Sequence, residues 1–187
     1  MNYDDLIKKW HIKASEEDYF SRYVFEYLAF IATLRKKGFT SAGSDRKAIQ
    51  LLKQNVHISN LYLRQVKYNA GNVKEAWENI INELNSSPLG NVSRTEEARE
   101  IGYWNCSHDV IDDKTKDEKS KFSGVIYNLE DWENMVEFWY SIRNNFFHGG
   151  KDPENRRDQL LIKNGFITLK LLVKMMIYDD KVFVSVH

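Results

Sequence analysis

Apolar side chains recur at three- and four-residue steps through most of this chain, and that spacing is typical of one face of an α-helix. The pattern is strongest over residues 16–37, where it predicts a helix that stops at Gly38. The 187 residues contain two prolines and nine glycines, and this low content also favours long helices. The apolar positions on the first helical face are Tyr19, Phe20, Tyr23, Val24, Tyr27, Leu28, Ile31 and Leu34.

Two more helices are predicted before residue 90, and a short one near residues 4–10 precedes the first. One of them spans about residues 44–71, with a serine or aspartate as its N-cap. The next spans about residues 72–84. Asn72 opens it, and Glu75 three residues later completes an approximate capping box.

Two helices are predicted in the C-terminal third of the chain. The first begins at Asn128 or Asp131 and runs to the glycine pair at 149–150. The last follows residues 152–154, which resemble an N-cap, a proline at the first helical position and a first-turn acid. The Asn-Gly pair at 164–165 falls inside this helix, but the apolar spacing continues beyond it, so a continuous or slightly kinked helix is favoured.

Residues 88–128 lack a helical period and are expected to form a long irregular insertion. Residues 112–121 within it are almost wholly charged, and a solvated loop is a better prediction for them than a binding tail. Residues 182–186 alternate like a strand, but they have no evident partner, so their structure stays open. The chain, residues 1–187, is therefore predicted to be a single all-α domain, an up-and-down helical bundle of four to five long helices.

Charge and composition limit the class of protein. Lys and Arg total 27, as do Asp and Glu, whereas a protein that coats nucleic acid non-specifically is strongly basic. Any nucleic-acid contact is therefore expected to be local. The single cysteine, Cys106, excludes an intramolecular disulfide and fits a reducing compartment. No apolar run approaches the ~20 residues that span a bilayer, and no signal peptide is predicted, so a cytoplasmic location without membrane contact is expected.

A cation, a carboxamide and an imidazole occur together just before a glycine pair. An arginine such as Arg143 can hold a phosphate through two parallel hydrogen bonds, and a histidine such as His148 can move a proton. On an unbroken helix Asn144 and His148 share a face, whereas Arg143 and His148 are about 140° apart. Convergence therefore requires that the helix unwinds before the glycines, or that two copies of the segment meet across a two-fold axis. A structural role is also open, because an arginine complements the dipole at a helix C-terminus and glycine ends a helix.

The longer string at residues 143–151, RNNFFHGGK, with Arg157-Asp158 and an apolar helix after it, resembles the signature of the HEPN superfamily (higher eukaryotes and prokaryotes nucleotide-binding domains). That signature is an arginine, commonly followed by a polar residue, and a histidine four to six residues beyond it. Here the polar residue is Asn144, and four residues separate Arg143 from His148. The resemblance covers about residues 129–178, and the motif has the same position, at the end of one long helix and before the last one.

The resemblance implies a metal-independent endoribonuclease without a cofactor, which acts on RNA as a homodimer with its site at the interface. Attack by the ribose 2′-hydroxyl would leave a 2′,3′-cyclic phosphate and a 5′-hydroxyl. By carry-over, Arg143 would bind the scissile phosphate, His148 would transfer a proton or hold the phosphate, and Asn144 would position one of them.

Many members of the superfamily work in toxin–antitoxin or antiviral defence systems, so an antitoxin or a nucleotidyltransferase is a possible partner protein. Other members are non-catalytic helical modules that bind RNA, a nucleotide or a partner protein, and this alternative function stays open for the present chain. Both motif residues are intact here, which favours the catalytic kind.

Four polar residues around the motif are weaker candidates for RNA binding, and a solvated helix face explains them equally well. Cys106 and His108 lie two residues apart, but two ligands without further ones do not make a zinc site, so no metal is predicted. The weaker candidates are Asn145, Lys151, Arg156 and Arg157.

Overall fold

The structure is a computed structural model that describes residues 3–15, 18–68, 71–90, 124–148, 151–179 and 181–183. Seven α-helices and no strand occur in these residues, so the predicted all-α class is confirmed. No helix among them is both long enough and apolar enough to cross a bilayer. The helices are α1 (Tyr3–Lys13), α2 (Tyr19–Thr33), α3 (Asp45–Gln54), α4 (Val56–Tyr68), α5 (Asn72–Ser86), α8 (Trp132–Phe147) and α9 (Arg156–Tyr178), with one π-helical turn, η1 (Leu34–Gly38), directly after α2.

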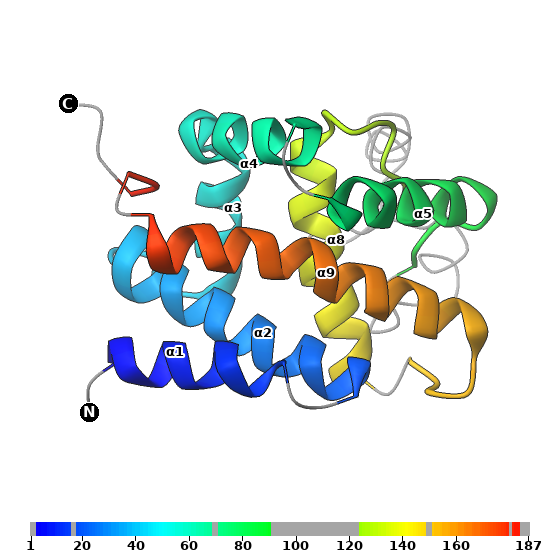
Figure 1. The fold of residues 1–187 in the computed structure, drawn as a ribbon, viewed down its shortest axis with the longest axis horizontal. Coiled ribbons are helices and arrows are strands. Elements are labelled where there is room, and N and C mark those ends of the chain that lie inside the picture. The colour runs from blue at the N-terminus through cyan, green and yellow to red at the C-terminus, as the bar shows by residue number, and fades with distance from the viewer. Residues whose placement is uncertain are drawn as a thin grey trace, which may run out of the picture.

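The longest helix, α9, organises the fold because α2 packs against one part of it and α5 against another (Figure 1). Helix α1 packs on α2. Helix α8 contacts both α3 and α9, and in Figure 1 it runs steeply past the nearly horizontal α9. The C-terminal end of α8 therefore reaches the edge of the molecule where α2 begins, and the rings of Phe20 and Phe146 meet there with centroids 5.8 Å apart.

The helix predicted over residues 44–71 is wrong, because the chain forms two helices there. Asn55 separates α3 from α4 with an extended backbone (φ −82°, ψ 95°), and its Oδ1 accepts the backbone N–H of Ile58 at 2.9 Å. A side chain that caps the next helix competes with continuation of the previous one. Apolar spacing continues across Asn55, so periodicity alone did not reveal the break.

Two predicted helix starts also differ from the structure. Gly71, in a left-handed conformation (φ 51°), precedes α5, so Asn72 is its first residue and not the cap. Asn155 caps α9, because its Oδ1 accepts the N–H groups of Arg157 and Asp158 at 2.9 and 3.2 Å. Asp152 instead accepts the N–H of Glu154 in a preceding turn. Beyond its start α9 is unbroken, as predicted. Residues 91–123, which include the predicted charged loop, and residues 184–187 lie outside the described residues.

The core holds α8 in place through an aromatic cluster around Trp139. The Trp139 ring centroid lies 5.4 Å from that of Trp77 and 5.6 Å from that of Tyr62. The indole N–H groups are satisfied inside the core: Trp139 donates to Thr168 Oγ1 at 3.0 Å, and Trp77 donates to the Tyr62 hydroxyl at 2.9 Å. Buried polar groups that are fully bonded specify one packing arrangement. This cluster therefore fixes α8 against α4, α5 and α9.

Glu26 is a fully buried carboxylate on α2, and it predicts a pH dependence of stability. Its Oε1 accepts a hydrogen bond from His11 Nδ1 of α1 at 2.7 Å, whereas its Oε2 has no partner in the described residues. Burial raises the pKa of Glu26 above its ordinary value of 4.5, although His11 and Lys170 oppose the rise. The folded state then binds the proton more tightly than the unfolded state, so Glu26 contributes stability below pH 4.5 that is lost as pH rises through its folded-state pKa.

The Glu26→Gln variant is therefore expected to be more stable than wild type at pH 7 and to lose less stability between pH 4.5 and 7. A one-unit difference in pKa between the two states corresponds to about 1.4 kcal/mol. Urea unfolding at several pH values measures this effect. Glu78→Gln is the control, because Glu78 is half exposed and 3.8 Å from Lys74. A wild-type pH dependence in the Glu26→Gln variant would contradict the expectation.

Candidate active site at the end of α8

Arg143 lies near the C-terminal end of α8, and its guanidinium contacts three side chains. Its Nη1 donates to Asn144 Oδ1 at 3.0 Å. The guanidinium carbon lies 4.7 Å from the ring centroid of Phe147 and 5.7 Å from that of Tyr27 on α2. Stacking on aromatic faces orients an arginine without neutralising its charge. No carboxylate pairs with Arg143 in the described part of the chain, so its charge is available to an anion.

Tyr27 is the residue beneath Arg143 that the sequence did not indicate as part of the site. Its side chain is buried, and its hydroxyl has no hydrogen-bond partner among the described residues. Burial raises the pKa of Tyr27 above its ordinary value, and the nearby Arg143 only partly offsets the rise. The phenol therefore stays neutral and offers a ring, not an anion, to the guanidinium. Its place in the apolar stripe of α2 predicted a core residue, and no local signal pairs it with Arg143.

His148 is the first residue after α8 and its side chain is exposed. Its backbone has left the helical conformation (φ −94°, ψ 14°), while its N–H still donates to the carbonyl oxygen of Asn144 at 3.0 Å. The helix thus ends between Phe147 and His148, and unwinding before the glycines is one of the two arrangements that would let Arg143 and His148 converge. The side chains of Arg143 and His148 share this end of α8, but no hydrogen bond joins them in the described residues. The glycines at 149–150 lie outside the description.

Three of the four weaker RNA-binding candidates have partners within the protein. Asn145 is buried, and its Nδ2 donates to the carbonyl oxygen of Gly90 at 2.7 Å. The Lys151 ammonium forms a nearly buried ion pair with Asp158 at 2.5 Å, and burial lowers the pKa of Lys151 although Asp158 opposes this.

Arg157, the third of these candidates, bridges α9 to the end of α5. Its Nε donates to Glu83 Oε1 at 2.8 Å, and its Nη2 contacts the carbonyl oxygen of Ser87. Arg156 differs because its side chain is exposed on the first turn of α9. Of the four candidates, Arg156 is therefore the one whose side chain is positioned to meet RNA without first leaving a protein partner.

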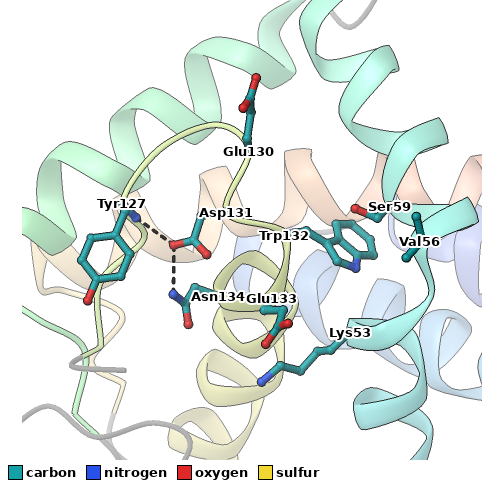
Figure 2. A pocket seen from close by; sticks show the side chains of 9 residues that line it. All are labelled: Lys53, Val56, Ser59, Tyr127, Glu130, Asp131, Trp132, Glu133 and Asn134. Carbon is teal, nitrogen blue, oxygen red and sulfur yellow. Dashed lines mark hydrogen bonds between the residues drawn. The ribbon is translucent and has the colours of Figure 1, made fainter. Parts of the chain in front are cut away.

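A hollow lies at the opposite, N-terminal end of α8 (Figure 2). Asp131 lines this hollow. Its Oδ2 accepts hydrogen bonds from the backbone N–H of Tyr127 and from Asn134 Nδ2, both at 2.9 Å. Lys53 also lines the hollow, and its Nζ donates to Glu137 Oε2 at 3.2 Å. These polar groups hold the start of α8 in position, so the hollow has a structural explanation.

The described histidines and carboxylates do not gather into a metal site. His57 Nε2 bonds to the carbonyl oxygen of Lys181 at 2.9 Å, which ties α4 to the C-terminal turn. Within the described ranges, no cluster of three His, Cys, Asp or Glu residues could hold a metal ion. Cys106 and His108 lie outside those ranges.

No family model matches this chain, and neither a curated protein nor a solved structure matches it. The HEPN resemblance therefore stays a prediction carried by residues 143–151 and by the geometry of Arg143, Asn144 and His148.

Proposed function

We propose that this protein is a metal-independent endoribonuclease of the HEPN type. The observation that supports the proposal most is the state of Arg143. Its guanidinium is oriented by Asn144 and two aromatic rings, has no carboxylate partner in the described residues, and lies at the same helix end as the exposed His148. A pre-oriented, unpaired cation and an exposed histidine at the same helix end suit a phosphodiester whose charge grows in the transition state.

The proposed reaction is an intramolecular transesterification. The ribose 2′-oxygen forms a bond to phosphorus while the bond to the 5′-oxygen of the next nucleotide breaks. The 2′-hydroxyl loses a proton and the leaving 5′-oxygen gains one, so proton transfer is required at both oxygens. His148 carries out proton transfer, and Arg143 donates hydrogen bonds to the non-bridging phosphate oxygens. Asn144 acts as a positioning residue, since its Oδ1 accepts from Arg143 Nη1.

The proposal includes a homodimer that forms through residues 143–151. Each subunit is proposed to be an up-and-down helical bundle. Phe147 supports the homodimer, because 56% of this large apolar side chain is exposed directly beside Arg143. Burial of such a ring against a second copy is favourable, and the two-fold axis would place a second histidine near the same phosphate. A molecular mass measured in solution tests the dimer.

The biological setting is proposed from the resemblance alone, as a defence or toxin–antitoxin system with an antitoxin or nucleotidyltransferase partner. The alternative, a non-catalytic module, is favoured by a specific observation. Two of the three cations among the weaker RNA-binding candidates, Lys151 and Arg157, are already paired with carboxylates, so the surface offered to RNA is small. That alternative predicts phosphate binding at Arg143 without strand cleavage.

The test is RNA cleavage in EDTA by wild type and by the His148→Asn variant. Wild type is expected to release fragments with 2′,3′-cyclic phosphate and 5′-hydroxyl ends. His148→Asn keeps a polar side chain but cannot transfer a proton near neutrality, so a loss of roughly 100- to 10,000-fold is expected. Cleavage that survives both Arg143→Ala and His148→Ala eliminates this function. RNA that binds but is never cut by wild type identifies the non-catalytic module.

A further inference from the structure

A hollow of about 510 Å³ lies where the end of α4, the start of α5 and the segment before α8 meet. Figure 1 places these elements at the opposite edge of the molecule from the C-terminal end of α8. Arg143 is three helical turns from Trp132, roughly 16 Å along the axis. The hollow is therefore separate from the candidate active site, and no residue discussed there lines it.

Three cations surround this hollow. Arg64 and Lys67 are one turn apart and project from the same face of α4, and Lys74 comes from the first turn of α5. Arg64 has no ion pair or hydrogen bond in the described residues, and the Lys67 ammonium lies 5.4 Å from the ring centroid of its neighbour Tyr68. Lys74 has a distant carboxylate partner in Glu78, 3.8 Å away on the exposed side.

The described residues around the hollow carry a net positive charge, which attracts an anion. Among the described residues that line it, Glu130 is the one carboxylate, against three cations. Like charges one turn apart on a helix destabilise it, and a bound anion removes that repulsion. Gly71, which precedes α5, provides no side chain to cap the first amide groups of that helix, so the helix dipole at this end adds to the attraction.

One wall of the same hollow is apolar. Val66 is buried there, Leu63 and Leu129 are half-buried, and the ring of Tyr68 is 68% exposed at the rim. Pockets that bind organic ligands combine an apolar surface with a few convergent polar groups, and this volume is within their usual range. The ligand should therefore carry a compact anion at one end and a flat or apolar group at the other.

We infer that this hollow binds a phosphate ester whose organic group is aromatic or apolar. The phosphate lies among Arg64, Lys67 and Lys74, and the organic group lies against Leu63 and Leu129. The inference does not depend on the proposed ribonuclease function. The same phosphate chemistry is offered by a free small molecule and by the 5′-phosphate end of an RNA.

Calorimetric titration with AMP, adenosine and inorganic phosphate tests the inference. Wild type is expected to bind AMP more tightly than either of the other two, because each of them lacks one half of the ligand. Arg64→Ala with Lys67→Ala is expected to weaken AMP binding roughly 10-fold or more, since charge-assisted hydrogen bonds are lost. Lys8→Ala with Lys9→Ala removes the same charge from the exposed face of α1 and should leave AMP binding unchanged.

The Arg143→Ala variant separates this site from the proposed active site. It should bind AMP as wild type does. Loss of AMP binding in Arg143→Ala but not in the α4 double variant overturns the inference and leaves the ribonuclease proposal intact. Equal binding of AMP and adenosine, or no binding of AMP, also overturns it.

The source of the phosphate is distinguished with short oligoribonucleotides in the His148→Ala background, where cleavage cannot interfere. If a 5′-phosphorylated oligomer binds like AMP and its 5′-hydroxyl counterpart does not, the site accepts an RNA end. If AMP binds and neither oligomer does, the site takes a free small molecule. Melting temperatures of every variant, measured without ligand, establish that the α4 substitutions leave the fold intact.

Discussion

The Arg143→Lys variant is expected to cleave RNA about 100- to 1,000-fold more slowly than wild type while keeping its fold. Lysine retains the positive charge, so the substitution removes geometry and not charge. The guanidinium donates to Asn144 Oδ1 and stacks on the rings of Phe147 and Tyr27, and under the proposed function its remaining N–H groups bind the phosphate. An ammonium on a flexible chain provides neither the planar fork nor this orientation.

Arg22→Lys is the matched control, because Arg22 also stacks on a tyrosine and a phenylalanine. Its guanidinium carbon lies 5.0 Å from the ring centroid of Tyr19 and 5.9 Å from that of Phe166. Loss of this stacking should change stability about as much as in Arg143→Lys but leave cleavage near the wild-type rate. Initial cleavage rates in EDTA, with melting temperatures for both variants, measure the contrast. Equal loss of activity in the two variants would refute a specific role for Arg143.

Much of the fold could be predicted because helix periodicity is a local property. The long apolar stripes of α2, α5, α8 and α9 were each identified at nearly the right residues. The errors are at helix ends, where a single side chain decides the outcome. Asn55 and Asn155 cap helices through their own Oδ1 atoms, although Asp152, three residues before Asn155, is also a common N-cap residue. Which of them caps depends on the packing of the helix that follows, and that packing is not local.

The candidate site was likewise predictable only where the residues involved are close together in the sequence. Arg143, Asn144 and His148 are close in sequence, so their common position at a helix end followed from the pattern. The partners that occupy Asn145 and Arg157 are distant in sequence. Gly90 lies 55 positions from Asn145, and Glu83 lies 74 positions from Arg157. A sequence pattern shows that a residue is polar, but only the tertiary structure shows whether its hydrogen bonds are already made.

The Glu137→Gln variant is expected to lose about 3 kcal/mol of unfolding free energy, the largest stability change predicted for this protein. Glu137 lies on the buried face of α8 with no exposed surface. Its two oxygens accept hydrogen bonds from Arg46 Nη1 at 2.6 and 2.8 Å, and Oε2 also lies 3.2 Å from Lys53 Nζ. The amide removes the negative charge that pairs with two cations of α3.

The expected loss is at the lower end of the usual 3–5 kcal/mol for a broken buried pair, because Arg46 is 31% exposed and can turn toward water. Glu83→Gln is the control. Its pair with Arg157 is 2.8 Å long but about a quarter to a third exposed, so a loss of about 0–1 kcal/mol is expected. Urea unfolding of the three proteins gives the comparison.

A triple variant distinguishes the cost of an uncompensated charge from the value of the ion pair itself. Replacing Glu137 with Leu and both Arg46 and Lys53 with Met removes the charges together and fills similar volume with apolar atoms. Such replacements are often neutral or stabilising, so the triple variant is expected to regain most of the stability that Glu137→Gln loses. If it is instead as unstable as the single variant, the ion pair contributes stability directly. In that case α8 would depend on this charged contact with α3 to present Arg143 at its far end.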